Sequence, residues 1–422
     1  MPTVDAVVSC PVHDSFRVQQ VAGLFDVPLA ARATERFTLD VPDLQSDPNW
    51  QIGLVTGPSG SGKSTIARAL FGADSICSAE PWPADRAVID GMGEQPIREL
   101  TSLLVSVGLG SPPAWIKPYT VLSGGERFRC DLARALARAT SGAPHLSREH
   151  SGANEPAVVA DESPEFGAAD DEAAAAAEPL VVFDEFTSVV DRQVAQIGSA
   201  AVARAIRRGA IRARFVAVTC HADVEAWLEP DWVIDMTDAA FHRRRLRRPP
   251  IEVEIRRCGR GAWAAFARHH YLSASLPAVV RCYLATWRGL PVTFCAVAPL
   301  AGRRGRWRIS RIVTLPDFQG VGIGMRVLEA VAGLYRSAGL RLNVTASHPG
   351  LLAHCVRSSD WVAVNQQKIG TRRHAIRDYR GSRGRAVVSF EYIGDCGASQ
   401  CADAPRAAIA TRAEAAQHQG AP

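Results

Sequence analysis

The 422-residue sequence has no apolar run of the length needed to span a bilayer, about 20 residues. Its first residues (MPTVDAVVSCPVHDSF) lack the basic stretch followed by an apolar stretch that is typical of a secretory signal. Its ten cysteines include no C-x-x-C pair, so we expect reduced thiols and no cysteine-based metal site. Together these absences favour a cytoplasmic protein without membrane association.

Charge is unevenly distributed along the chain, although the formal net charge is only +5. Residues 1–240 hold 19 of the 48 Lys and Arg residues but 33 of the 43 Asp and Glu residues, whereas residues 241–422 are strongly basic. A chain of this length exceeds one ordinary core, so the two regions predict at least two domains. The basic region indicates an anionic partner, and a nucleic acid is the candidate.

A glycine-rich stretch, GPSGSGKST at 57–65, matches the phosphate-binding pattern G-x-x-x-x-G-K-[ST]. It follows an apolar run of buried-strand type, 52–56, and precedes a helical pattern. Such glycines let backbone N–H groups turn toward a phosphate chain at a helix N-terminus, where a lysine adds charge and a hydroxyl binds Mg²⁺. The stretch therefore predicts a nucleotide site. Its residues are Gly57, Gly60, Gly62, Lys63, Ser64 and Thr65.

Three further segments with candidate functional residues follow this loop along the chain. LSGGE at 122–126 starts a helical pattern and offers a second phosphate-binding helix N-terminus. The apolar run 180–183 predicts a buried strand that presents two acidic residues at its carboxyl end, where α/β sheets place their chemistry. A second apolar run, 215–220, leads to a histidine. The candidate residues of these segments are Ser123, Gly124, Gly125, Asp184, Glu185 and His221.

In this order the segments resemble the ATP-binding cassette (ABC) ATPases, whose signature is LSGGQ; this chain has Glu126 in place of Gln. The resemblance implies an α/β P-loop NTPase fold with ATP and Mg²⁺ as ligands. It also implies an ATP-bound homodimer, in which the signature of one copy closes over the nucleotide of the other. Asp184 would orient Mg²⁺, Glu185 would be the general base and His221 would sense the γ-phosphate. Gln95 is the candidate for the family's Q-loop.

Two features depart from transporter cassettes. About 58 residues separate Ser64 from Leu122, too few for the full helical subdomain that grips a membrane partner. Residues 141–178 form an insertion with 9 acidic residues, 1 arginine and much Ala, Ser and Pro, and we expect it to be disordered. Residues 1–240 are therefore predicted to form a non-transporter ABC-type domain, with a transporter ATPase subunit as an alternative.

An Arg-rich linker is predicted at 241–250, where HRRRLRRPP places five arginines before two prolines. It is either a solvated tether or a strip that contacts a phosphate backbone. Beyond it, residues 251–395 alternate strand-like and helix-like stretches. VVRCYLATW and LPVTFCAVAPL predict a hairpin around Arg288 and Gly289, and RWRISRIVTLP predicts a further strand.

A second glycine loop lies within DFQGVGIGMRVLEAVAGLYRSAG at 317–339, before an amphipathic helical pattern. This segment resembles motif A of the GNAT acyltransferases, Q/R-x-x-G-x-G/A. Residues 251–395 are therefore predicted to form an α+β GNAT-like domain, and residues 396–422 a flexible tail. The resemblance implies that N–H groups at the helix start bind the pyrophosphate of acetyl-CoA or another acyl-CoA. The residues concerned are Gln319, Gly320, Gly322 and Gly324.

The catalytic groups of this second domain are marked by a weaker pattern. Many GNAT enzymes place a Tyr to protonate the departing thiolate, whereas LLAHCVRSSDW offers only serines in that region. His348 is the candidate acid or base, and His269 and His270 lie in the substrate-side region. We predict an ATPase coupled to an acyltransferase that acts on a nucleic acid or a nucleic-acid-bound acceptor. The alternative is a remodelling or sensing ATPase whose GNAT-like module only binds its ligand.

Overall fold

The computed structural model describes residues 3–29, 32–77, 81–141, 178–243, 245–270, 275–368, 386–394 and 407–409. Strands within these ranges form an eight-stranded, a six-stranded and a two-stranded sheet. The predicted mixture of helices and strands is therefore confirmed for the described chain. Most of the predicted acidic insertion and of the predicted tail lies outside the described residues.

The six-stranded sheet consists of β3 (Ile52–Thr56), β4 (Ile76–Cys77), β5 (Leu180–Phe183), β6 (Arg214–Thr219), β7 (Trp232–Asp235) and β8 (Ala240–His242). Their order is β4-β5-β6-β3-β7-β8, and all neighbours are parallel except β7 and β8. The inner strands are short apolar runs, as expected for parallel strands that helices cover on both faces. The carboxyl ends of β3, β5 and β6 meet at one edge, which brings their following loops together.

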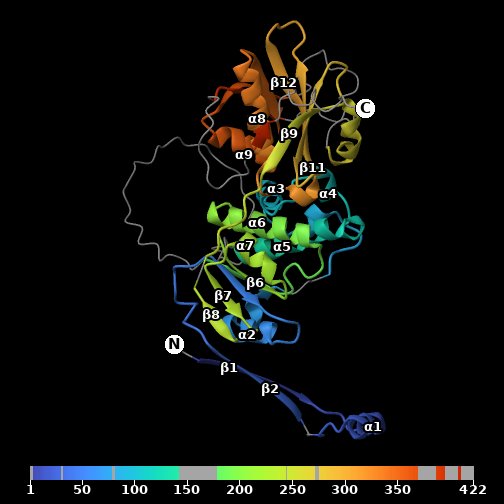
Figure 1. The fold of residues 1–422 in the computed structure, drawn as a ribbon, viewed down its shortest axis with the longest axis vertical. Helices are drawn as coiled ribbons and strands as arrows, with labels where there is room; N and C mark the ends of the chain where they lie inside the picture. The colour runs from blue at the N-terminus through green and yellow to red at the C-terminus, as the bar shows by residue number, and fades with distance from the viewer. Residues whose placement is uncertain are drawn as a thin grey trace, which may run out of the picture.

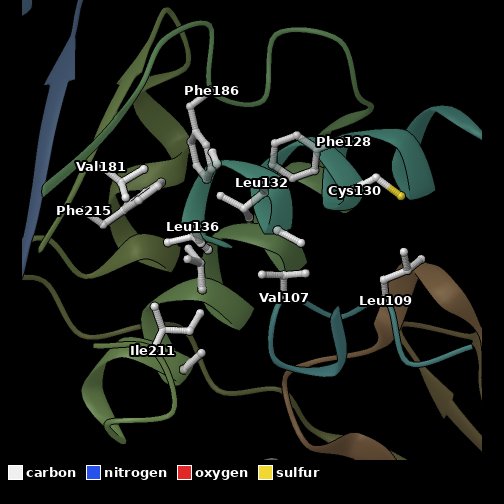
Figure 2. Packing of buried hydrophobic residues seen from close by; sticks show 14 of the residues in the cluster. Val107, Leu109, Phe128, Cys130, Leu132, Leu136, Val181, Phe186, Ile211 and Phe215 are labelled. Carbon is white, nitrogen blue, oxygen red and sulfur yellow. The ribbon is translucent and has the colours of Figure 1, made fainter. Parts of the chain in front are cut away.

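The helices of this N-terminal part are α2 (Lys63–Phe71), α3 (Ile97–Ser106), α4 (Pro112–Trp115), α5 (Gly124–Ser141), α6 (Arg192–Arg207) and α7 (Glu225–Leu228). Figure 1 shows α3, α5 and α6 between the six-stranded sheet and the elements of the C-terminal part. Leu132 and Leu136 of α5 belong to the same buried cluster as Val181 and Phe215 of the sheet (Figure 2). Burial of these apolar faces fixes the helices on the sheet.

An arm precedes the phosphate loop and consists of β1 (Thr3–Pro11), α1 (Phe16–Phe25) and β2 (Arg32–Asp40), with β1 and β2 antiparallel. In Figure 1, α1 lies at the far end of this arm, away from the two larger sheets. The apolar and polar positions alternate in residues 15–45, which predicts strands; this prediction is wrong for residues 16–25, because they form α1. The Ser15 hydroxyl caps the helix by accepting the Val18 N–H at 3.3 Å, and no residue of α1 is buried.

The eight-stranded sheet has the order β14-β15-β13-β12-β11-β10-β9-β16. The hairpin predicted around Arg288 and Gly289 is confirmed by the antiparallel pairing of its two flanking strands. Three residues of the predicted tail form a short strand that pairs with the first strand of this sheet. The strands are β9 (Val253–Cys258), β10 (Arg281–Trp287), β11 (Leu290–Pro299), β12 (Arg306–Thr314), β13 (Arg341–Ala346), β14 (Trp361–Lys368), β15 (Ala386–Tyr392) and β16 (Ala407–Ile409).

One of the buried hydrophobic clusters spans the N-terminal and C-terminal parts. The C-terminal part adds the 3₁₀ turn η7 (Pro316–Phe318) and the helices α8 (Ile323–Ser337) and α9 (Pro349–Arg357). Ile197 of α6 and Trp227 of α7 belong to the same buried cluster as Phe318 of η7. The Trp227 ring packs edge-on against Trp287 of β10, with centroids 6.1 Å apart. Helix α6 therefore contacts both the six-stranded sheet and the C-terminal part.

Candidate functional site

The loop between β3 and α2 holds the first predicted phosphate ligands. Gly60 and Gly62 have φ angles of 80° and 81°, which glycine adopts without the strain that a Cβ causes. The Lys63 ammonium donates to the Pro58 carbonyl at 2.6 Å and so lies over the loop. A Cβ at Gly62 would lie 2.5 Å from the Phe37 ring, so β2 covers one side of the loop. Gly57 directly follows β3, and Ser64 and Thr65 lie in the first turn of α2.

Ser64 and Asp184 meet at the carboxyl edge of the six-stranded sheet. The Ser64 hydroxyl donates to Asp184 Oδ1 at 3.0 Å, across 120 residues of sequence. The same carboxylate oxygen accepts the Glu185 N–H at 3.0 Å. A hydroxyl and a carboxylate are the oxygen ligands that Mg²⁺ takes beside a nucleotide, so the donor set fits this ion.

Glu185 and His221 lie on neighbouring loops at this edge. Glu185 has φ 54°, an uncommon angle for a residue with a side chain, and its carboxylate accepts the Ser188 hydroxyl at 2.6 Å. His221 Nδ1 lies 3.3 Å from Thr187 Oγ1. Burial, followed by the charge of Arg192, lowers the pKa of His221, and the Glu185 charge opposes this shift. The His221 ring is therefore largely neutral at pH 7.

Gln95 lies in the loop before α3, and the signature residues lie at the start of α5. The Gln95 amide donates to the Ala137 carbonyl of α5 at 2.8 Å, so its predicted role at the nucleotide stays a prediction. Ser123 and Glu126 form a capping box at the start of α5. Glu126 Oε2 accepts the Ser123 N–H at 3.0 Å, and the Ser123 hydroxyl accepts the Glu126 N–H at 3.3 Å. Gly124 and Gly125 form the first turn.

The second glycine loop packs directly against the N-terminal part. Gln319 bridges the two parts, because its amide donates to the Thr314 carbonyl at 2.8 Å and accepts the Gly110 N–H at 2.7 Å. A Cβ at Gly320 would lie 2.5 Å from the Ala201 Cβ of α6, so only glycine allows this approach. Gly322 and Gly324 follow at the start of α8. The structure therefore places this loop in the interface between the two parts.

A cavity of about 750 Å³ opens beside this loop. Strands β12 and β13 pair only from Arg306 with Arg341 to Ile309 with Val344 and then separate. The following residues of both strands line the cavity, as does the start of α8. The other wall belongs to the N-terminal part, through residues of α3 and α6. A volume of this size is typical of sites for small molecules and cofactors.

Three histidines that the sequence singled out line this cavity: His269, His270 and His348. His348 Nε2 lies 2.8 Å from the Gly110 carbonyl oxygen, so this nitrogen carries the proton and donates. Burial lowers the pKa of His348, although its bond to Gly110 acts in the opposite direction, so the ring is neutral at pH 7. This bond ties α9 to the N-terminal part, and the predicted catalytic role of His348 stays a prediction.

No sequence motif marks several basic residues that line the cavity. Arg204 and Arg208 from the end of α6 and Arg357 of α9 all line it. They belong to segments about 150 residues apart and match no motif, so only the fold brings them together. Their charge was visible in the sequence, since RAIRR ends α6, but a helix end with arginines is commonly a solvated surface.

Two features are absent among the described residues, a membrane-spanning helix and a cluster of metal ligands. Among the described helices, none has both the length and the apolar composition that crossing a membrane requires. In the same residues, no three His, Cys, Asp or Glu side chains gather as metal ligands. The Mg²⁺ expected here would depend on the nucleotide for its remaining ligands.

No protein-family model and no curated protein matches the chain, whereas solved acetyltransferase structures match a part of it. The IAA acetyltransferase from Bacillus cereus ATCC 14579 is 18% identical, over 33% of this chain and 99% of its own, with a TM-score of 0.27. The ribosomal-protein-S18-alanine N-acetyltransferase from Escherichia coli is 15% identical, over 35% and 99%, with a TM-score of 0.27. An acetyl-CoA-bound GNAT family acetyltransferase from Elizabethkingia anophelis is 15% identical, over 34% and 98%, with a TM-score of 0.27.

The likeness to GNAT acetyltransferases thus covers about a third of the chain, and this part of the prediction is shown. At a TM-score of 0.27 the likeness establishes neither an activity nor a ligand. None of these three neighbours is an ATPase. ATP binding and hydrolysis therefore rest on the residues of the chain itself and stay predictions.

Proposed function

We propose that the chain hydrolyses ATP with Mg²⁺ and transfers an acyl group from acyl-CoA to an amine. One observation carries the ATPase half: Ser64 of the phosphate loop is hydrogen-bonded to Asp184, and Glu185 follows directly. Lys63 and the loop N–H groups bind the β- and γ-phosphates, and Ser64 and Asp184 hold Mg²⁺. The water oxygen bonds to the γ-phosphorus while Glu185 accepts a proton from that water. The bond between the γ-phosphorus and the ADP oxygen breaks.

The acyltransferase half is supported by the cavity between the separated strands β12 and β13. N–H groups at the start of α8 bind the cofactor's pyrophosphate, and the strands guide its thioester into the cavity. Acyl-CoA supplies an activated acyl group. The acceptor nitrogen bonds to the acyl carbon, the C–S bond breaks, and the nitrogen's proton leaves as the thiolate is protonated. His269, His270 and His348 line the cavity and are the proposed groups for these proton transfers.

We further propose an ATP-bound homodimer and a nucleic-acid partner. The Ser123 start of α5 is exposed, and Val189 between β5 and α6 is 76% exposed, as a surface that meets a second copy requires. Arg303 and Arg304 between β11 and β12 are exposed cations that suit a phosphate backbone. ATP-driven closure would then grip the polymer while the cavity modifies it.

A second candidate function follows from the chemistry of the cavity wall. Among the described residues that line it, no tyrosine is present to protonate a thiolate. An ATPase with a GNAT-like module that binds acyl-CoA without transferring the acyl group is therefore the rival. Both candidate functions use the same ATP site and bind acyl-CoA, and they differ in whether the acyl group is transferred.

Titration with acetyl-CoA tests the cofactor site. We expect saturable binding by calorimetry, weakened about 10- to 100-fold in Gly324→Ala, the range for losing a charged hydrogen-bonded contact. A Cβ at Gly324 would lie 2.6 Å from Thr314 Oγ1 and would push α8 away from β12. Gly333→Ala is the control, because nothing lies within 4 Å of a Cβ there. Absence of binding by the native protein would end the acyl-CoA proposal, and binding without acyl transfer to any amine would favour the rival.

Replacing Lys63 with alanine tests the nucleotide site. We expect the affinity for ATP to fall about 10- to 100-fold, because charge-assisted contacts to the β- and γ-phosphates disappear. Lys117→Ala is the matched control, since the Lys117 side chain is exposed on the loop after α4. The dissociation constants of a fluorescent ATP analogue measure both effects. Equal affinities of the two variants would contradict a nucleotide at this loop.

A further inference from the structure

Arg204 reaches from the end of α6 into the second glycine loop. Its Cζ and Nη2 would lie 2.6 Å from a Cβ at Gly322, and its Nη1 would overlap that atom. Gly322 has φ 90°, so glycine is required there by both backbone and space. The Arg204 guanidinium therefore lies against the N-terminus of α8, a position with positive potential that would repel a cation.

The charges around Arg204 increase this repulsion. Burial is the main reason that the pKa of Arg204 falls to about 10, and the charges of Arg208, Arg248, Arg326 and Arg357 lower it further. Of these, Arg326 pairs with the Glu329 carboxylate at 3.2 Å, and that carboxylate also accepts from His354 at 2.9 Å. Arg204 itself has no carboxylate partner in the part of the chain that the structure describes. A largely buried cation among cations is costly unless an anion completes the site.

We propose that Arg204, with Arg208 and Arg357, binds the diphosphate of acyl-CoA, so that the ATPase part supplies cofactor ligands to the acyltransferase part. This assignment rests on the proposed acyl-CoA cavity. The Arg204 guanidinium lies directly against Gly322, so a diphosphate at the start of α8 would lie beside it and accept from both Arg204 and the glycine-loop N–H groups. Arg208 and Arg357 line the same cavity and add charge for the remaining phosphate oxygens. A diphosphate suits this cluster better than a single carboxylate, because three arginines and a helix N-terminus converge.

Helix α6 gives this contact a consequence for the ATP site. Asp191 caps its N-terminus by accepting the Val194 N–H at 3.0 Å, only a few residues after Glu185. The 16 residues of α6 then span about 24 Å and end near Arg204. One rigid helix therefore joins the hydrolysis segment to the cofactor diphosphate. If ATP-driven closure shifts α6 and thereby changes the affinity for acyl-CoA, reciprocal linkage requires acyl-CoA to change the affinity for ATP by the same factor.

Two ligands and two variants test this proposal by calorimetry. Arg204→Met removes the charge and keeps the length of the side chain. We expect the affinity for acetyl-CoA to fall about 10- to 100-fold, the range for a buried charged contact, with no change for acetyl-pantetheine, which lacks the phosphates. Arg212→Met is the control, because this exposed arginine lies after α6 and outside the cavity. In the absence of cofactor, Arg204→Met should unfold at or above the native temperature, since it relieves repulsion.

The outcomes separate this proposal from the function on which it rests. Unchanged acetyl-CoA affinity in Arg204→Met, while Gly324→Ala weakens it, would overturn the role of Arg204 and leave the acyl-CoA site in place. Equal losses for acetyl-CoA and acetyl-pantetheine would show that Arg204 shapes the cavity and binds no phosphate, which also overturns the proposal. No binding by the native protein overturns both. If Arg204→Met fails to fold, Arg204→Lys replaces it, with an expected smaller loss confined to acetyl-CoA.

Discussion

Replacing Glu185 with glutamine is expected to lower the rate of ATP hydrolysis about 10²- to 10⁴-fold, the contribution of a positioned general base. Glutamine keeps the shape of the side chain and cannot take a proton from the attacking water. The backbone N–H of Glu185 donates to the Asp184 carboxylate, which also accepts the Ser64 hydroxyl. The proposed Mg²⁺ ligands and the proposed base therefore belong to one hydrogen-bonded group. ATP binding should therefore survive the substitution.

The measurement combines steady-state phosphate release with light scattering. We expect Glu185→Gln to show an ATP-dependent doubling of mass, because the composite site closes on two nucleotides and does not reopen without hydrolysis. Glu99→Gln is the matched control, since Glu99 is exposed on α3, far along the chain from the Ser64 and Asp184 pair. Multiple turnovers at the native rate by Glu185→Gln would exclude this residue as the base. A monomer that binds ATP without associating would contradict the homodimer.

The strands around the ATP site were predictable because local sequence determines them. β3, β5 and β6 are short apolar runs, each followed by polar or glycine residues, and burial on both faces requires such runs. The Ser64 and Asp184 contact followed from that topology, since the carboxyl ends of parallel strands share an edge. The substitution of Glu126 in the signature also has a local reason. Ser123 and Glu126 have the S-x-x-E spacing of a capping box, and the structure forms it.

Other elements could not be predicted, because long-range packing creates them. α1 buries no residue, so packing against a core does not impose a helical spacing of apolar residues on its sequence. The cavity proposed for acyl-CoA has one wall on α6 and the other on β12 and α8, more than 100 residues later. Gln319 matched a motif for binding pyrophosphate, yet its side chain bonds to Gly110 and Thr314 and serves the interface. Arg204 carries no motif and acquires its proposed role from that interface alone.

Replacing Phe186 with alanine is expected to lower the free energy of unfolding by about 3–5 kcal/mol, the range for truncating a buried phenylalanine. Its side chain is 0% exposed. Figure 2 shows its ring among the buried residues, near Phe128 of α5 and Phe215 of β6. The centroid of the Phe186 ring lies 5.5 Å from that of Phe128 and 5.6 Å from that of Phe215. The cavity left behind has rigid walls from three elements, α5, β5 and β6, so it cannot close without moving them.

The same substitution should also affect hydrolysis, because Phe186 directly follows Glu185. The Phe186 N–H donates to the Val218 carbonyl at 2.8 Å, and the buried ring fixes the chain where Glu185 takes its unusual φ of 54°. Urea unfolding measures the stability change, and phosphate release at a temperature where the variant is folded measures the loss of turnover. Phe16→Ala is the control, since this ring is 74% exposed on α1 and should change the unfolding free energy by less than about 0.5 kcal/mol. Equal losses of unfolding free energy in the two variants would contradict the burial of Phe186. Full ATP turnover in folded Phe186→Ala would show that the packing of this ring does not hold Glu185 in position.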